Sequence, residues 1–452
     1  MTHTPTPAEA DIPALVARLR ATFDSGRTKP LAWRLDRLAA LRTLLTEQAE
    51  VFQQALAADL GKSATEAYRT EIGFVLNELD HTVAHLEEWL RPKPAAVPGF
   101  FQPAEAHVVR DPLGVVLVVA PWNYPLQLAL APLVGVLAAG NTAVVKPSEL
   151  APETSAAMAR LLPRYLDPET VAVVEGAVPE TTALLEQRFD HIFYTGNGAV
   201  GRIVMAAAAR NLTPVTLELG GKSPVVVEPG ADLAVTARRI AQGKFLNAGQ
   251  TCVAPDYVLA IGESAAGLEK HLADAVREMY GDDPAASPEY GRIVNERHFD
   301  RLAALLDDGR TVTGGGRDRA ARYLAPTVLA DVSPDAAVMR AEIFGPILPI
   351  VAVPDLDAAI AFINERDKPL ALYAFTESER TKRRLTEETS SGALSFGLPV
   401  SHLAMPELPF GGVGESGMGR YHGEYSIDTF SHTKAVVDKP LVDRPVADRP
   451  RA

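Results

Sequence analysis

Residues 115–146, VVLVVAPWNYPLQLALAPLVGVLAAGNTAVVK, carry the clearest fold signal in the chain. It begins and ends with short runs rich in Val, at 115–120 and 142–146, and the longer apolar segment 126–139 lies between them. Short, continuous apolar runs with β-branched residues predict strands that are buried on both faces. A strand, a helix and a strand in this order predict a parallel βαβ unit.

The same alternation continues along the chain. Further strand-like runs occupy 171–176 and 191–196, and helix-like stretches occupy 152–166 and 179–188. A second set of strand-like runs, at 213–220, 223–228 and 256–261, predicts that another α/β region begins there. The first hundred residues read as helices, with apolar residues on one stripe (Leu35, Leu38, Leu41, Leu45 and Phe52) and a stop at Gly61. The pattern therefore predicts an α/β fold with a doubly wound parallel sheet.

Composition limits the classes of function. The 452 residues carry a formal net charge of −13, and 47% of them are hydrophobic. An acidic chain without a long basic run is not expected to bind nucleic acid or an anionic membrane. The longest apolar run is too short to cross a bilayer, and the N-terminus lacks the pattern of a signal peptide. A single cysteine is typical of a reducing compartment, so a cytoplasmic location is expected.

That single cysteine is Cys252, in the polar loop NAGQTCVAPD at 247–256. A free cysteine most often behaves as a small buried hydrophobic residue. Its thiolate is also the strongest nucleophile among the side chains. No histidine lies near it in the sequence, so no local Cys–His pair is indicated. The residues alone leave both interpretations open.

A glycine-rich turn predicts a dinucleotide. Gly196, Gly198 and Gly201 follow a strand-like run in G-x-G-x-x-G order and open an Ala-rich helix, an arrangement in which a pyrophosphate meets the helix N-terminus. A tight turn without a ligand is the alternative. Two acidic residues could hold the ribose, Glu218 in TLELGG and Glu149 beside Lys146. The residues alone do not say which of these holds the ribose and which is free for catalysis.

Seven motifs carry a resemblance to a known family: APWNYP, KPSE, FYTGNGAVG, LELGGKSP, GQTCVAPD, EIFGP and PFGGVGESGMGRYHG. In this order and spacing, from about residue 13 to residue 437, the chain resembles NAD(P)-dependent aldehyde dehydrogenases. The stretches GQTCVAPDY and GMGRYHGEYSIDTFSH are most similar to the class 3 branch, which acts on medium-chain, long-chain fatty and aromatic aldehydes. The resemblance implies an oxidoreductase that forms carboxylates from aldehydes with NAD, with NADP also accepted. It also implies a homodimer.

The resemblance assigns roles to individual residues. It implies that Cys252 is the nucleophile, Glu218 the general base and Asn123 the oxyanion donor. Gly198 stands where the family usually has Thr or Ser. Tyr124 and Phe410 are candidates for the substrate tunnel, and no metal is implied. The expected cofactor contacts are Trp122, Lys146, Glu149, Gly196, Asn197, Gly198, Gly201, Glu342 and Phe344.

The resemblance also implies three parts and a tail. These are an NAD(P)-binding domain of Rossmann type (1–90 and 111–219), an α/β catalytic domain (220–420), a small β oligomerisation arm (91–110 and 421–439) and a flexible tail (440–452).

Three other functions remain as alternatives. An acylating enzyme would pass the acyl group of the thioester to coenzyme A. That transfer needs no base to activate water, so the presence of Glu218 argues against this alternative. An idle binding protein on the same fold would not need Cys252, Glu218 and Asn123 together. A cysteine hydrolase would not need the glycine turn.

Overall fold

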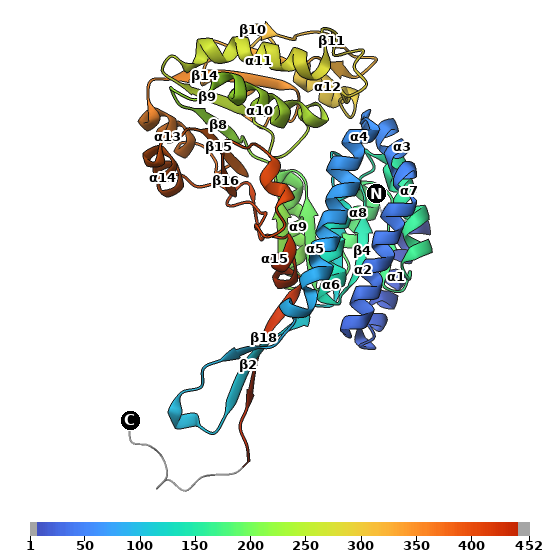
Figure 1. Ribbon diagram of the computed structural model, residues 1–452. Helices are drawn as coiled ribbons and strands as arrows, with labels where there is room; N and C mark the ends of the chain where they lie inside the picture. The colour runs from blue at the N-terminus through green and yellow to red at the C-terminus, as the bar shows by residue number, and fades with distance from the viewer. Residues whose placement is uncertain (1–6, 442–452) are drawn as a thin grey trace.

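The computed structural model describes residues 7–441 of the chain. Figure 1 shows two bodies side by side, each built around a sheet, and a thin arm that extends away from them. The first two residues of the predicted tail are described, and the rest of it lies outside the described residues.

The first body contains a six-stranded sheet in the order β17-β7-β6-β3-β4-β5. All neighbours are parallel except β17, which pairs antiparallel with β7. The apolar runs form strands because both faces of the sheet are covered by helices. The predicted βαβ unit is confirmed. The strands are β3 (Val115–Val119), β4 (Thr142–Lys146), β5 (Val171–Val173), β6 (His191–Thr195), β7 (Val215–Glu218) and β17 (Gly417–Met418).

One strand is in a different sheet from the one predicted. The run at 213–220 was expected to begin the second α/β region, but β7 pairs with β6 and completes the first sheet. The second region begins one strand later, at β8 (Pro224–Val227).

Helix α6 (Gln127–Ala139) is the centre of the first body, and all of its residues are buried. It packs against α2, α5 and α15, the last of which comes from the far end of the chain. A Cβ on Gly135 of α6 would lie 2.6 Å from the Cβ of Ser426, so α15 approaches the α6 backbone closely. The helices of this body are α1 (Pro7–Asp24), α2 (Leu31–Glu47), α3 (Ala49–Leu60), α4 (Ala64–Ala67), a π-helical turn (Tyr68–Ile72), α5 (Gly73–Trp89), α6, α7 (Pro152–Tyr165), α8 (Val178–Leu185), α9 (Gly198–Ala209) and α15 (Gly423–Thr429).

The stripe of apolar residues predicted near the N-terminus runs over two helices rather than one. Helices α2 and α3 meet at Gln48, which has non-helical backbone angles. Helix α3 ends at Gly61 with φ of 68°, the left-handed conformation that favours glycine at this position.

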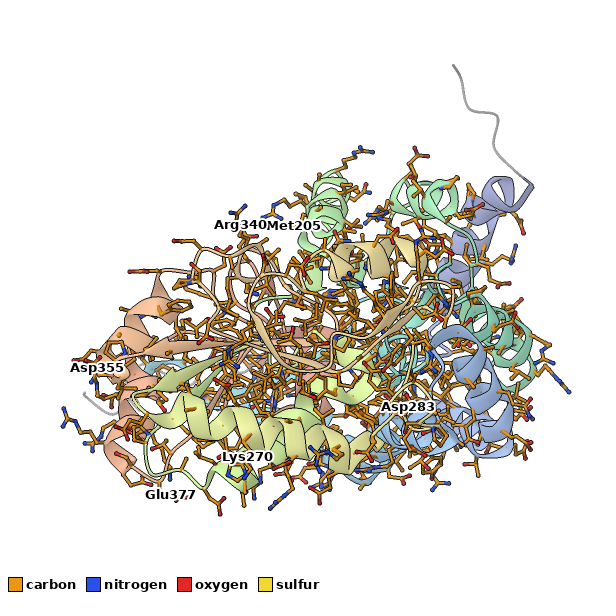
Figure 2. The ribbon with its side chains drawn as sticks, turned by 90° about the horizontal axis from the view of Figure 1, so that it is seen from above. Met205, Lys270, Asp283, Arg340, Asp355 and Glu377 are labelled. Atoms are coloured by element: carbon orange, nitrogen blue, oxygen red, sulfur yellow. The ribbon has the colours of Figure 1, made fainter. Side chains whose placement is uncertain are left out.

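The second body contains a seven-stranded sheet in the order β10-β13-β14-β9-β8-β15-β16, parallel except at β10. Its strands are β8, β9 (Tyr257–Ile261), β10 (Arg310–Thr313), β13 (Thr327–Ala330), β14 (Ile347–Val353), β15 (Ala371–Phe375) and β16 (Ala393–Phe396). Its helices are α10 (Leu233–Phe245), α11 (Ser264–Tyr280), α12 (Glu296–Ala303), α13 (Leu356–Asn364) and α14 (Glu379–Glu388), with a small hairpin of β11 (Arg317–Asp318) and β12 (Tyr323–Leu324). Figure 2 shows that charged side chains such as Lys270, Asp355 and Glu377 point outward from this body.

The arm is a three-stranded antiparallel sheet in the order β1-β2-β18. The proline-rich segment supplies β1 (Lys93–Ala95) and the start of β2 (Glu105–Pro112). Strand β18 (Ser431–Asp438) pairs with all eight residues of β2, from Ser431 opposite Pro112 to Asp438 opposite Glu105. Within the predicted segment 421–439, the residues of α15 belong to the first body instead, where they pack on α5 and α6.

Within residues 7–441, no helix combines the length and the apolar character that a bilayer span requires.

Candidate active site

The predicted site residues lie at one edge of the first sheet. Strands β3, β4, β6 and β7 are parallel, so their carboxyl ends share an edge. Asn123 follows β3, Lys146 ends β4, Gly196 follows β6 and Glu218 ends β7. The direction of winding reverses between β3 and β6, and ligands bind at such switch points in doubly wound sheets.

The loop before Cys252 has unusual backbone angles. Asn247, Ala248 and Gly249 have φ of 53°, 50° and 74°. Consecutive non-glycine residues in the left-handed region are uncommon and persist only where the surroundings hold them. A Cβ on Gly249 would lie 2.3 Å from the carbonyl oxygen of Gly345, so only glycine fits there. The loop therefore packs against the EIFGP segment.

Cys252 is half-buried at the boundary between the two bodies. The Asn123 side-chain amide donates to the carbonyl of Gln250 (3.0 Å), and the Tyr373 hydroxyl donates to the carbonyl of Val253 (2.7 Å). The backbone is therefore held on both sides of Cys252. Burial raises the pKa of the Cys252 thiol far above its ordinary value, and the nearby Glu342 and Glu218 carboxylates raise it further. The thiol is therefore protonated at neutral pH in the free protein.

Glu218 is a buried carboxyl group without a partner. Its residue is 2% exposed, and neither side-chain oxygen has a hydrogen bond to any of residues 7–441. Burial raises its pKa well above the ordinary value. Because buried polar atoms are nearly always hydrogen-bonded, an orphaned carboxyl group marks a place where a ligand or water supplies the missing partner. Such a group holds its proton more tightly than a solvated glutamate does, as catalytic acids and bases often do.

Glu342 and Phe344 bring the EIFGP segment to the same place. A Cβ on Gly220 would lie 1.9 Å from a carboxylate oxygen of Glu342, so this side chain lies directly over the backbone that follows Glu218. Burial, with a contribution from Asp256, raises the pKa of Glu342 to about 8. Phe344 has φ of 51°, and its ring meets Trp122 edge-on with centroids 5.4 Å apart.

These pKa shifts predict how the thiol reacts with iodoacetamide. Above pH 8 Glu342 is a carboxylate that disfavours the thiolate, so Glu342→Gln should lower the pKa of Cys252 and raise its alkylation rate several-fold at pH 9. At pH 6, where Glu342 is already neutral, the two proteins should react alike. Because the chain has one cysteine, mass spectrometry of the intact protein measures the rate without interference. A wild-type rate for the variant at pH 9 would contradict the assigned coupling.

Asn123 is 3% exposed, and its backbone is fixed as well as its side chain. Its carbonyl oxygen accepts from Lys62 Nζ (3.1 Å) and from Asn247 Nδ2 (2.8 Å). The side-chain amide uses one hydrogen for Gln250, so the second remains available to a ligand.

The glycine turn opens helix α9 at its N-terminus, as the motif predicts. Asn197 caps α9 by accepting from the Val200 N–H (3.0 Å). A Cβ on Gly196 would lie 2.2 Å from the Tyr194 hydroxyl oxygen, and one on Gly201 would lie 3.1 Å from Leu219. A Cβ on Gly198 would meet only the end of the flexible Arg202 side chain, at 3.0 Å. A side chain at position 198 therefore has room once Arg202 moves.

Lys146 and Glu149 are brought together at the end of β4. Lys146 is 2% exposed, and its ammonium donates to the carbonyl of Pro147 (2.7 Å) and lies 3.7 Å from a carboxylate oxygen of the exposed Glu149. Burial lowers the pKa of Lys146. A buried ammonium with three donors and few acceptors suits an oxygen-rich ligand such as a ribose.

Tyr124 and Phe410 are both buried, at 6% and 5% exposure. The Tyr124 hydroxyl is 2.7 Å from Thr251 Oγ1, next to Cys252 in the chain. Phe410 packs against Tyr421 and His422, with ring centroids 5.8 and 5.9 Å away.

Sequence reasoning missed a group of charged residues beneath this site. Lys62, Glu66 and Glu71 are all buried. Lys62 contacts Asn123 and Glu66 contacts Asn247, while Glu71 pairs with Lys62. In the sequence they look like the charges of any solvated helix. Only the folded structure distinguishes them from exposed charges, because it places them beside the loops that carry Asn123 and Cys252. Gln250, which joins both loops, lay inside the quoted cysteine motif without an assigned role.

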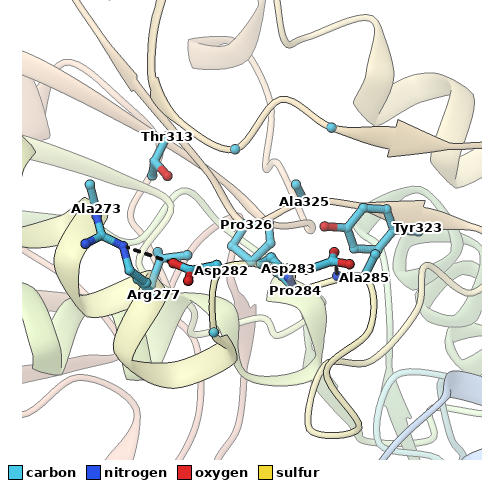
Figure 3. A pocket seen from close by; sticks show the side chains of 14 residues that line it. Ala273, Arg277, Asp282, Asp283, Pro284, Ala285, Thr313, Tyr323, Ala325 and Pro326 are labelled. Atoms are coloured by element: carbon cyan, nitrogen blue, oxygen red, sulfur yellow. Dashed lines mark hydrogen bonds and ion pairs between the residues drawn. The ribbon is translucent and has the colours of Figure 1, made fainter.

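A cavity of about 390 Å³ lies away from these residues, at the end of α11. Figure 3 shows it lined by Tyr323, Pro326 and the ion pair of Arg277 with Asp282. It contains none of the predicted site residues, and no nucleophile converges on it with an acid or base. Within residues 7–441, no cluster of three or more His, Cys, Asp or Glu side chains could hold a metal.

Comparisons with known proteins agree with the fold and the motifs. A profile described as the aldehyde dehydrogenase family matches residues 1–436. The mouse protein named aldehyde dehydrogenase family 3 member A2 is 51% identical over 94% of this chain and 88% of its own. The rat aldehyde dehydrogenase named dimeric and NADP-preferring is 48% identical over 94% of each chain.

Solved structures show the same relationship. The substrate-bound state of Staphylococcus aureus AldH is 44% identical, covers 97% of this chain and 96% of its own, and has a TM-score of 0.94. An aldehyde dehydrogenase of Mycobacterium tuberculosis in complex with NAD+ is 29% identical, covers 98% of this chain and 92% of its own, and has a TM-score of 0.86. The molecule is thus an α/β oxidoreductase of two sheets with a β arm. It belongs to the aldehyde dehydrogenase family. The predicted family, its class 3 likeness and the fold class are confirmed.

Proposed function

We propose that this aldehyde dehydrogenase oxidises apolar aldehydes to carboxylates through a covalent intermediate on Cys252, which Glu218 hydrolyses by activating water. The observation that carries the proposal is the meeting of three features at one sheet edge. These are a lone half-buried thiol, an orphaned buried carboxyl group and a fixed amide with a free hydrogen.

The first step is attack on the aldehyde. The half-buried Cys252 loses its proton to solvent, and the thiolate sulfur then bonds to the carbonyl carbon. The aldehyde oxygen becomes an oxyanion, which the free hydrogen of Asn123 Nδ2 and the backbone N–H of Cys252 are placed to stabilise. Removal of one such donor typically raises the barrier by about 2.7–4 kcal/mol.

The second stage hydrolyses the thioester on Cys252. The carboxylate of Glu218 takes a proton from water, the resulting hydroxide attacks the thioester carbon, and the thiolate leaves. Burial, which disfavours the ionised form of Glu218, also makes that form a stronger base. When bound, the oxidised nicotinamide supplies the hydride acceptor between these two stages.

The residues at the sheet edge fit a nicotinamide dinucleotide. The α9 N-terminus suits a pyrophosphate, and the Lys146–Glu149 pair suits a ribose. NAD+ and NADP are named for the M. tuberculosis structure and the rat relative respectively. We propose that this enzyme prefers NAD and also accepts NADP, because Glu149 repels a 2′-phosphate while Lys146 attracts it.

Glu149→Gln tests that balance. The exposed carboxylate repels the 2′-phosphate only weakly, by about 0–1 kcal/mol, so its loss should raise kcat/KM for NADP up to about fivefold relative to NAD. Steady-state kinetics with both cofactors measures the ratio, and Glu153→Gln, on the first turn of α7, is the control. An unchanged ratio would remove Glu149 from the ribose site.

The substrate class is proposed to be medium-chain, long-chain or aromatic aldehydes. The likeness to family 3 members supports this, as do the aromatic residues Tyr124 and Phe410 near the site. The experiment that tests the whole proposal measures NADH and NADPH formation across an aldehyde panel, with and without coenzyme A. Turnover that requires coenzyme A would favour the acylating alternative instead.

We further propose a cytoplasmic homodimer of the three parts given from the sequence, with α15 and β17 assigned to the NAD(P)-binding part, in which the arm contributes to the subunit contact. The word dimeric in the name of the rat relative supports the dimer. Strand β18 supports it too, because it lies at the edge of its sheet with exposed side chains and can pair with another strand. Light scattering of the full chain measures the assembly. The single cysteine supports the location.

A further inference from the structure

Beneath the Asn123 turn lies an ion pair without solvent contact. The Lys62 and Glu71 side chains are both 0% exposed, and Lys62 Nζ lies 2.5 Å from Glu71 Oε1. Burial of two charges is costly, and a buried pair is weak evidence for stability by itself. Since the pair need not stabilise the fold, its role has to be inferred from the groups that it contacts.

Among residues 7–441, the remaining hydrogen bonds of the pair go to the turn that carries Asn123 and to the start of α6. Lys62 Nζ donates to the Asn123 carbonyl (3.1 Å) and lies 4.0 Å above the centre of the Tyr124 ring. The other carboxylate oxygen of Glu71 accepts from the backbone N–H groups of Leu126 (3.1 Å) and Gln127 (2.8 Å), where α6 begins. The pair thus holds the middle of the turn between β3 and α6 and the end at which α6 begins.

The same segment holds the cysteine loop. Glu66 Oε1 accepts from the backbone N–H of Asn247 (2.7 Å), which is in the left-handed conformation. Asn247 Nδ2 in turn donates to the Asn123 carbonyl (2.8 Å) and the Gln250 carbonyl (3.2 Å). The π-helical turn Tyr68–Ile72 carries Glu71, and such turns are frequent at functional sites.

We propose that Lys62 and Glu71 are positioning residues for the reaction: they fix the Asn123 turn against the Cys252 loop, so that the free amide hydrogen of Asn123 points at the oxyanion. This inference rests on the proposed role of Asn123. Neither residue reaches the reacting atoms. Their effect is on the chemical step, because a displacement of about 1 Å in a reacting group costs up to about 100-fold in rate.

The test compares single and double variants. Lys62→Met leaves Glu71 buried and unpaired, so both stability and rate should fall. Lys62→Met/Glu71→Gln removes both charges, so thermal stability should recover relative to the single variant. One of the two donors to the Asn123 carbonyl is still missing, so the burst rate of NADH formation should stay about 10- to 100-fold below wild type, with aldehyde KM nearly unchanged. Recovery of the rate together with the stability would show a structural role only.

Two further variants keep the test decisive. Asn247→Gly removes the other donor to the same carbonyl without backbone strain, since φ is 53° there, and should also slow the burst. Asp59→Asn is the matched control. Asp59 is a buried carboxylate that accepts from the N–H groups of Glu153 (3.1 Å) and Thr154 (2.9 Å) at the start of α7 and does not touch the turn. It should lower stability and leave the burst rate at saturating cofactor unchanged.

Asn123→Ala separates the two proposals. A wild-type burst rate in Asn123→Ala overturns the oxyanion role, and the positioning proposal falls with it. A slow Asn123→Ala beside a wild-type rate in the Lys62→Met/Glu71→Gln variant overturns the positioning role alone. If both are slow, Lys62→Met added to Asn123→Ala should cost little further rate, because the two changes remove one interaction.

Discussion

Cys252→Ser is expected to abolish NAD-dependent aldehyde oxidation, with a loss of at least about 10³-fold in kcat/KM. A serine hydroxyl at this position lacks the nucleophilicity of a thiolate, and within residues 7–441 no histidine bonds to residue 252 to activate it. Steady-state formation of NADH from an apolar aldehyde measures the loss. Electrospray mass spectrometry of the quenched wild-type enzyme should show an acyl adduct that the variant lacks.

The substitution nearly preserves volume, so the fold should persist. The chain offers no second cysteine as a matched control, and thermal unfolding and NADH binding serve instead. Both should stay near wild type in Cys252→Ser. A variant that binds cofactor normally and turns over at a near wild-type rate would exclude Cys252 as the nucleophile.

Glu218→Gln is expected to separate the two stages of the reaction. Without a base for water, thioester hydrolysis should slow by about 10²- to 10⁴-fold, while hydride transfer continues. Rapid mixing should show a burst of about one NADH per site, followed by a slow steady state. Glutamine is nearly isosteric, and it also removes an ionisable group from a fully buried position, so stability should not fall.

Glu342→Gln is the matched control, because it changes a second buried carboxyl group of the same site. A burst followed by slow turnover in Glu342→Gln, with normal turnover in Glu218→Gln, would show that Glu342 and not Glu218 is the general base. Loss of the burst in Glu218→Gln, with aldehyde and cofactor still bound, would show that Glu218 acts at or before the hydride-transfer step.

The strands of the first sheet could be predicted because burial on both faces leaves a local trace. The run at Val115–Val119 contains only valine and leucine, and every residue in it is buried. The partner of a strand leaves no such trace. The run that forms β7 resembles the one that forms β8, yet β7 joins the first sheet and β8 the second. That choice depends on which helices cover each sheet, and no short window of sequence contains this information.

The same contrast holds for the site. The roles expected for Asn123, Glu218 and Cys252 come from the family resemblance, because each residue stands in a recognisable motif, whereas the residues alone leave the role of Glu218 open. Lys62 and Glu71 could not be found in this way, because a buried charge and an exposed one look alike until the fold is known. Likewise, the left-handed conformations of Ala248 and Phe344 follow from the close packing of two loops that lie far apart in the sequence.

The return of the C-terminal segment to the first body has a consequence for synthesis on the ribosome. Strand β17 pairs with β7 at the edge of the first sheet, and helix α15 covers α6. The partners of both elements lie before residue 220. While residues 220–410 are being made, the nascent chain must therefore carry an uncovered apolar face of α6 and a β7 edge whose backbone N–H and C=O groups are unpaired. Although its first sheet lies early in the sequence, the enzyme cannot fold strictly from the N-terminus. A chain released before residue 411 should aggregate or engage chaperones, whereas the finished chain should not.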